Sequence, residues 1–246
     1  MMSGVKRNIS ILALAILWEL APRVGLVRMD SLPPISHIAV AWFQLARDGE
    51  LFIHAGMSLG RAGAGLLIAV ITGSVLGVSM ATWTPIRLLF RPLMEAFYPI
   101  PKSALIPVTA LWLGLGDASK VVLIALGCIL PVTIGAYNGA RGCERVLIWS
   151  ARGMGASKLR TLIDVVVPSA LPELLNGIRT ALALAFVLLV SAELIVAKNG
   201  LGYLIGLLGG TGQYDGMFAV VLTIAGIGLL ADRLYARFTS SVLSWQ

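Results

Sequence analysis

The hydrophobic positions of this chain form long blocks, and most polar and charged positions lie in short segments between them. Six apolar blocks are found, at about 8–27, 62–80, 93–113, 121–137, 172–196 and 217–230. A helix of roughly 20 mainly apolar residues is long enough to cross a bilayer. The pattern therefore predicts an all-α, polytopic membrane protein with about six transmembrane helices.

The composition supports this class. Of 246 residues, 58% are hydrophobic and 13% are charged, whereas a soluble domain carries roughly a quarter charged residues. A net charge of +7 would suggest a nucleic-acid partner in a soluble chain. In a membrane chain, basic loops on the cytosolic side explain the same charge, so we expect no nucleic acid. The two cysteines have no C-x-x-C spacing, and neither a disulfide framework nor a metal site is expected.

The positions of the basic residues predict the topology. Because basic loops remain in the cytosol, we expect a multi-pass protein of the inner membrane with both termini in the cytoplasm. A cleaved signal peptide is the alternative for the first block. That block contains Trp18 and Glu19 and has no small-residue cleavage site before Pro22, so we interpret it as a retained span. The basic residues that indicate the cytosolic side are Lys6, Arg7, Arg87, Arg91, Arg141, Arg145, Arg152, Lys158, Arg160, Arg233 and Arg237.

The second block carries small residues at every fourth position. Gly65, Ala69, Gly73 and Gly77 would share one face of a helix. Small residues on one face allow two membrane helices to approach closely. We therefore expect this face to be a helix-packing surface.

The third block is interrupted by prolines at positions 99, 101 and 107. Each proline removes a backbone donor, and a carbonyl freed in lipid needs another partner. Such a helix should be buried or should line a water-filled path. Lys102 and Ser103 are therefore candidate pathway residues, although Lys102 could instead extend its ammonium to an interface.

The fifth block contains Ser191 and Glu193 near its end. A carboxylate within a membrane span is by default a candidate functional residue. The alternative is a structural role, as a salt bridge with Lys198 or a helix-end contact in the dimer. The glycine-rich stretch 206–216 has no following lysine and is interpreted as a loop, not as a phosphate-binding motif.

The segment from Trp149 to Ala185 separates the fourth and fifth blocks and carries charge, glycine and proline. Residues 153–164 are basic and amphipathic, which predicts a short surface helix. A break bounded by Pro168 and Pro172 should follow, with the next helix beginning at Pro172. A helix exposed on one side of the membrane suits the docking of a partner.

This segment resembles the EAA loop of type I ABC importer permeases. Residues 155–157 (Gly-Ala-Ser) match the glycine and the positions after it, 167–172 match the proline turn, and 176–179 match the family's G-L-R. Trp149-Ser150-Ala151 stands where the family has Glu-Ala-Ala. Residues 98–107, 113–120, 192–193 and 200–203 match further family motifs in order. The opening of the external loop, 31–34, is similar to that of the nitrate, sulfonate and taurine branch.

The resemblance implies the type I (MetI-like) permease fold. Residues 1–53 would form a first transmembrane helix and an external loop. Residues 54–238 would form the transmembrane domain, with a cytosolic coupling loop at about 141–172. The implied function is a permease that forms the translocation pathway for a small solute, an anion such as nitrate, sulfonate or taurine. Candidate ATPase-coupling residues are Ala151, Gly155, Ala156, Ser157, Lys158 and Leu159, and candidate pathway residues are Lys102, Ser103, Ser191 and Glu193.

The resemblance also implies the partners. They are two ATPase subunits, a second copy of the permease, a periplasmic or lipid-anchored solute-binding protein, and membrane lipid. The sequence has no G-x-x-x-x-G-K-[ST] motif, so ATP and Mg²⁺ are expected on the ATPase and the chain itself is not expected to be an enzyme. A secondary transporter driven by an ion gradient is the alternative, and the proline-broken third block would suit it. The basic coupling segment and the lack of an internal repeat argue against it.

Overall fold

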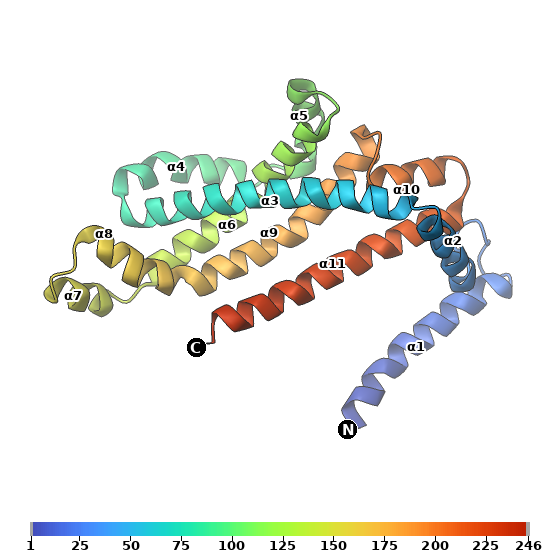
Figure 1. Ribbon diagram of the computed structural model, residues 1–246, viewed down its shortest axis with the longest axis horizontal. Helices are drawn as coiled ribbons and strands as arrows, with labels where there is room; N and C mark the ends of the chain where they lie inside the picture. Colours follow the sequence, from blue (N-terminus) through green and yellow to red (C-terminus); the bar gives the residue numbers. More distant parts are fainter. Residues whose placement is uncertain (1, 245–246) are drawn as a thin grey trace. The chain divides into compact units, whose positions relative to one another are not determined.

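The computed structural model describes residues 2–244, except for the side chains of residues 2–8 and 11. The described residues form helices and no strand, which confirms the all-α prediction (Figure 1). In chain order the elements are α1 (Met2–Arg23), α2 (Ile35–Arg47), α3 (Glu50–Thr82), α4 (Thr84–Phe97), the 3₁₀ turn η1 (Lys102–Leu105), α5 (Ile106–Leu113), α6 (Asp117–Gly142), α7 (Arg145–Gly153), α8 (Lys158–Thr161), the π-helical turn η2 (Leu162–Val166), α9 (Val167–Val196), α10 (Leu201–Gly210) and α11 (Tyr214–Val242).

Four helical stretches of the described chain are long and apolar enough to cross a membrane. They are α3, α6, the stretch Lys158–Val196 and α11. They contain the predicted second, fourth, fifth and sixth spans, which confirms these four. The predicted first span overlaps α1 but overruns its end, because the chain turns at Gly25, whose φ is +76°.

The third predicted span, at 93–113, is broken near its prolines into separate helices. Helix α4 ends at Phe97, residues 98–101 are not helical, and η1 and α5 follow. Pro99 and Pro101 cannot donate to the preceding turn. The Lys102 ammonium donates to the carbonyls of Phe97 (2.5 Å) and Ile100 (2.8 Å), which lie at this break. A lysine at a helix C-terminus stabilises the unpaired carbonyls there.

The predicted break between Pro168 and Pro172 is wrong, because the chain is helical through both prolines. One helical stretch runs from Lys158 to Val196, with Pro172 inside α9. The turn η2 is π-helical and lies directly before α9, where Pro168 is the second residue. The Ser169 hydroxyl donates to the carbonyl of Val165 (2.7 Å) and supplies a donor in a turn that lacks the Pro168 N–H. Such local adjustments allow proline inside a membrane helix.

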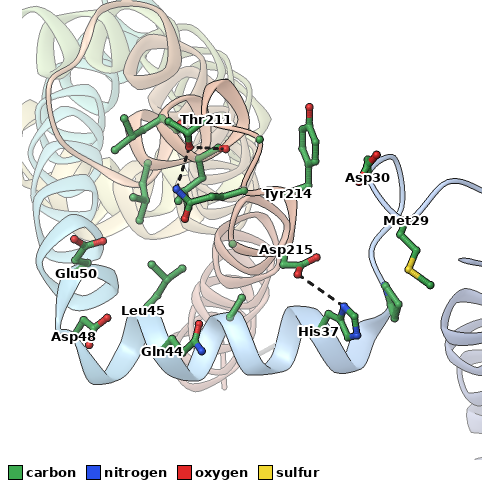
Figure 2. A pocket seen from close by; sticks show the side chains of 18 residues that line it. Met29, Asp30, His37, Gln44, Leu45, Asp48, Glu50, Thr211, Tyr214 and Asp215 are labelled. Atoms are coloured by element: carbon green, nitrogen blue, oxygen red, sulfur yellow. Dashed lines mark hydrogen bonds and ion pairs between the residues drawn. The ribbon is translucent and has the colours of Figure 1, made fainter. Parts of the chain in front are cut away.

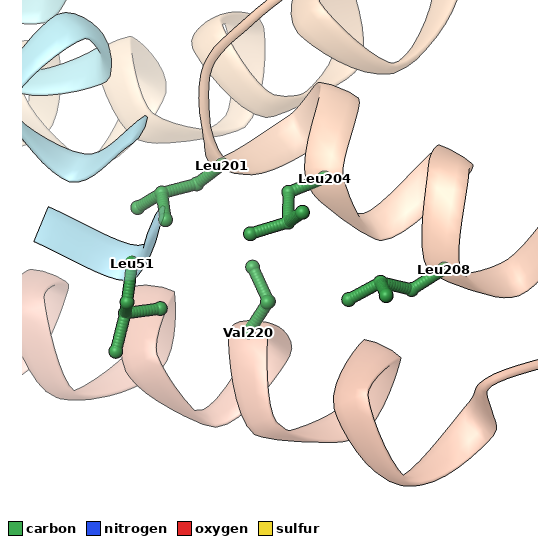
Figure 3. Close-up of a cluster of buried hydrophobic side chains, with 5 residues drawn as sticks. All are labelled: Leu51, Leu201, Leu204, Leu208 and Val220. Carbon is green, nitrogen blue, oxygen red and sulfur yellow. The ribbon is translucent and has the colours of Figure 1, made fainter. Parts of the chain in front are cut away.

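The chain divides into two compact units. The first comprises Met1–Ser58 and Glu193–Ile227. Its core joins Leu51 at the start of α3, the apolar face of α10 and Val220 of α11 (Figure 3). The Trp42 indole of α2 donates to the Thr223 hydroxyl of α11 (3.0 Å). These contacts hold α2 and α10 against the first half of α11. The core side chains are Leu51, Leu201, Leu204, Leu208 and Val220.

The second unit comprises Leu59–Ala192 and Gly228–Gln246. In it α6 packs on α3 through glycine. A Cβ added to Gly77 would lie 2.5 Å from the Thr133 carbonyl oxygen, and one added to Gly73 would lie 2.9 Å from the Val132 Cβ. Ala69, on the same face, has 0% exposure. The predicted packing face of the second block is confirmed.

Helix α6 also packs on α9 through glycine. A Cβ on Gly135 would lie 2.5 Å from the Glu173 carbonyl oxygen, and one on Gly177 would lie 2.6 Å from the Pro131 carbonyl oxygen. Both obstacles are backbone atoms, which cannot rotate away. The backbones of α6 and α9 therefore touch directly, and only glycine fits between them.

Replacing Gly77 tests this packing. We expect Gly77→Leu to force α3 away from α6, because overpacking a tight contact costs about 1–3 kcal/mol or more. The measurement is the thermal unfolding midpoint of the detergent-purified protein, together with its monodisperse yield. Gly63→Leu, on the same helix, is the matched control, because a Cβ there meets no atom within 4 Å. Equal behaviour of the two variants would contradict the packing described.

Candidate coupling segment and transport pathway

Helix α7 lies within the candidate coupling segment, predicted at about 141–172, and a specific turn ends that helix. The amide of Gly155 donates to the Arg152 carbonyl and the amide of Ala156 to the Ala151 carbonyl, both at 3.0 Å. This is the hydrogen-bond pattern of a Schellman turn, in which the residue after the cap takes a left-handed conformation. Gly155 has φ +85°, a region that glycine enters without strain. Gly155 therefore ends α7 and reverses the chain.

Ser157 begins the next helix. Its side chain accepts a hydrogen bond from the amide of Arg160 (3.2 Å), as expected of an N-cap. Lys158 and Leu159 are then the first two residues of the long helical stretch. The predicted surface helix at 153–164 is thus corrected: a turn at 154–157 separates α7 from a helix that starts at Lys158. Glycine at 155 and a capping serine at 157 are the physical reason.

Large apolar side chains of this segment face solvent. Trp149, Met154 and Leu159 are 64%, 83% and 65% exposed, and Ile163 is also exposed. We call these four residues the coupling patch. Ala151, by contrast, is buried. Exposed apolar side chains in a segment that carries many basic residues indicate a surface covered by a partner.

A small core fixes the coupling segment to the second unit. Ala140 and Cys143 at the end of α6 pack with Val166 of η2 and Ala170 of α9. Ile148 of α7 packs against this cluster. The cluster therefore packs α7 and the start of α9 against the end of α6.

A cavity of about 500 Å³ in the second unit is the candidate transport pathway. It lies between α6, α9 and the irregular turn before η1. The glycines of the α6–α9 contact leave backbone exposed to it. Its polar lining residues are Tyr98, Lys102, Asn138, Glu173, Asn176 and Thr180.

Of the four candidate pathway residues, Lys102 lines this cavity. Ser103 is exposed on η1. The hydroxyl of Ser191 donates to the Val187 carbonyl of its own helix (2.8 Å). Sequence reasoning missed Glu173, Asn176 and Thr180, although polar residues three or four positions apart within an apolar block mark one helix face.

Glu193 lies in the first unit, and its side chain has 0% exposure. The Ser58 hydroxyl lies 2.7 and 2.9 Å from its two carboxyl oxygens, and the Gly202 amide donates to it at 3.0 Å. Ser58 in turn accepts from the amide of Leu201 (2.8 Å). A carboxylate that accepts at a helix N-terminus stabilises that helix. These contacts indicate a structural role for Glu193 at the start of α10, made within this chain and therefore different from the predicted contact in the dimer.

The loop before α10 closes over this carboxylate. Gly200 has φ +108°, and a Cβ at this position would overlap the carboxyl group of Glu193. The Gly200 amide donates to Nδ1 of His54 (2.9 Å). Glycine is therefore required here for both conformation and space.

A second cavity, of about 720 Å³, lies in the first unit, on the side predicted to be external. Figure 2 shows α2 along its base and the turn between α10 and α11 above it. His37 Nδ1 lies 3.9 Å from a carboxyl oxygen of Asp215. Acidic residues dominate the charged part of the lining, namely Asp30, Asp48, Glu50 and Asp215.

The Glu193 contacts generate a prediction. Glu193→Ala should lower the stability of the purified protein by about 1.5–3 kcal/mol, because hydrogen bonds to a charged group are lost and Ser58 loses a buried partner. Thermal unfolding measures this. Ser191→Ala is the control and should change little, since its hydroxyl bonds only within its own helix. A Glu193→Ala protein of unchanged stability that no longer transports would instead favour the pathway role.

Comparison with known proteins gives the family. Residues 65–244 match the family model described as binding-protein-dependent transport system inner membrane component. The putative aliphatic sulfonates transport permease protein SsuC of Bacillus subtilis (strain 168) is 32% identical over 230 residues, covering 94% of this chain and 83% of that protein. The taurine transport system permease protein TauC of Escherichia coli (strain K12) is 34% identical over 233 residues, covering 91% and 82%.

The solved structures agree on the fold. A chain of the MetNI methionine ABC transporter in an inward-facing conformation matches with TM-score 0.68 and 20% identity, covering 80% of this chain and 98% of that one. This confirms the predicted type I importer fold.

The family consists of multi-pass inner-membrane permease subunits, which work with a separate ATPase and a solute-binding protein, so the ion-gradient alternative does not apply. With its permease fold and the match over residues 65–244, this chain belongs to the binding-protein-dependent transport system inner membrane components, the permease subunits of ABC importers.

Proposed function

We propose that this chain is the permease of an importer for small organic sulfonates, with taurine and short alkanesulfonates as the substrate class. The names of the two relatives support this class. The main support for the mechanism is the exposure of the coupling patch. This patch lies at the start of a continuous helical stretch, 158–196, that also lines the pathway cavity.

In this proposal each of two ATPase subunits receives one coupling segment in a surface cleft. Lys158 and Leu159 contact the ATPase, while Gly155, Ala156 and Ser157 set the turn that presents them. Buried Ala151 anchors the end of α7. The position that is glutamate in the family motif is Trp149, 64% exposed, so the contact there is apolar in place of ionic. ATP and Mg²⁺ are bound by the ATPase subunits.

A second copy of the chain completes the pathway. On α5, Leu111 and Trp112 are 83% and 69% exposed, and α4 buries none of its residues within this chain. Helices with so much free apolar surface beside the cavity suit a permease partner. Lys102 and Ser103, at the turn between α4 and α5, then lie at the entrance to a pathway shared by the two copies.

The external side of the first unit receives the solute-binding protein. The 720 Å³ cavity of Figure 2 offers a concave surface there. Both termini lie in the cytoplasm, because the basic residues of the loops place the coupling segment on that side.

ATPase binding tests the coupling patch. Leu159→Asp should reduce the amount of ATPase that co-purifies with the permease at least about tenfold, because a carboxylate would be buried in an apolar cleft. Densitometry of the purified complex measures the ratio. Leu159→Met keeps the apolar volume and serves as the control. Full retention of the ATPase by Leu159→Asp would place the docking surface elsewhere.

The turn itself gives a second test. Gly155→Val should leave a folded permease whose transport is uncoupled, because a β-branched residue at φ +85° strains the turn by roughly 1–2 kcal/mol and redirects the patch. ATP-driven uptake in proteoliposomes should fall at least about tenfold. Gly155→Asn should retain most activity, since asparagine tolerates this conformation. Normal uptake by Gly155→Val would rule out the coupling role of the turn.

A further inference from the structure

A third cavity lies in the second unit. Its volume is about 480 Å³, and it is bounded by the end of α3, by α4 and by α6. The residues that line it are Met80, Arg91, Met94, Glu95, Tyr98, Leu130, Ile134, Tyr137, Asn138 and Arg141. The set combines two arginines with a mostly apolar wall.

The charged end of the cavity carries a net positive charge. Arg91 donates from Nε to the Glu95 carboxylate (2.8 Å), one turn along α4, so these two charges balance. The Arg141 guanidinium donates to the Tyr137 hydroxyl (2.8 Å) and stacks on that ring at 5.6 Å. A phenol carries no charge, so the positive charge of Arg141 remains for an anion. Two guanidinium groups are well suited to a phosphate or sulfonate.

The apolar end extends away from this charge along α6. This part of the wall is formed by residues four positions apart on α6, namely Leu130, Ile134 and Asn138, and Arg141 follows them on the same helix. From Arg141 to Leu130 the helix rises by about 16 Å at 1.5 Å per residue. This length is much greater than that of taurine or a short alkanesulfonate, and it matches a substantial part of one acyl chain.

The cavity also has a defined depth in the membrane. Arg141 lies one residue before the end of α6 and precedes the basic coupling segment. The charged end therefore lies at the predicted cytosolic boundary, and the apolar end points into the bilayer. Basic pockets between membrane helices on this side bind anionic lipid headgroups.

We propose that this cavity binds one anionic phospholipid of the cytosolic leaflet. The phosphate lies between Arg91 and Arg141, and an acyl chain follows Ile134 and Leu130 beside Met94. The proposal depends on the membrane topology and not on the transported substrate. Tyr98, Leu130, Ile134 and Asn138 also line the pathway cavity, so the bound lipid would lie directly beside the transport route.

Native mass spectrometry of the full chain, released from detergent with added phosphatidylglycerol or phosphatidylcholine, tests this. Wild type should retain phosphatidylglycerol in preference to phosphatidylcholine. The double variant Arg91→Gln, Arg141→Gln should retain at least about five-fold less phosphatidylglycerol than wild type. Arg87→Gln is the matched control: Arg87 lies on the same helix, donates to Thr84, and does not line the cavity.

A second variant keeps both arginines and fills the apolar end. Ile134→Trp should lower phosphatidylglycerol retention to a similar degree while the protein remains monodisperse. An equal loss in Arg87→Gln would mean general attraction to basic residues and would overturn the proposal, as would full retention in the double variant. If the double variant instead loses binding of an alkanesulfonate and not of phosphatidylglycerol, the cavity belongs to the transport route and the lipid site is wrong.

Discussion

The direct backbone contact of α6 with α3 and α9 is the constraint on which the second unit depends. In lipid there is no hydrophobic force between helices, so association depends on close packing and hydrogen bonds. Gly77 on α3, Gly135 on α6 and Gly177 on α9 remove the side chains that would keep the helices apart. Gly135 and Gly177 also line the pathway cavity. At the α6–α9 contact, packing and the cavity therefore depend on the same glycines.

The stretch Lys158–Val196 connects the two functional regions. Leu159 of the coupling patch and Glu173 of the pathway cavity lie on this single helical stretch, about 21 Å apart at 1.5 Å per residue. We therefore expect a displacement of the proposed coupling segment to move the proposed pathway lining, as in a shear or hinge transition. The π-helical turn η2 lies between the two regions, and such turns are frequent at functional sites.

Much of the fold could be predicted from the sequence because its signals are local. Long apolar blocks identified α3, α6 and α11, and the four-residue spacing of small residues identified the face of α3 that contacts α6. Gly155 and Ser157 matched a known motif, and their roles as a left-handed turn and an N-cap depend only on neighbouring residues.

The remaining features could not be predicted because they depend on partners that local patterns do not show. The third block breaks after Phe97, where the Lys102 side chain folds back onto free carbonyls. Pro172 lies inside α9, although proline usually begins or ends a helix. The partner of Glu193 is Ser58, which is 135 residues away in the sequence. Asn138 and Glu173 were missed because the cavity forms only when α6 and α9 meet.

We propose that ATP hydrolysis on a partner, transmitted through the coupling segment, drives solute across this permease. Uptake of labelled taurine or an alkanesulfonate into proteoliposomes tests it most directly, with the permease, its ATPase and a loaded binding protein present. We expect uptake to require ATP on the ATPase side and to continue after ionophores collapse the proton and sodium gradients. Uptake without ATP that stops when the gradients collapse would contradict it.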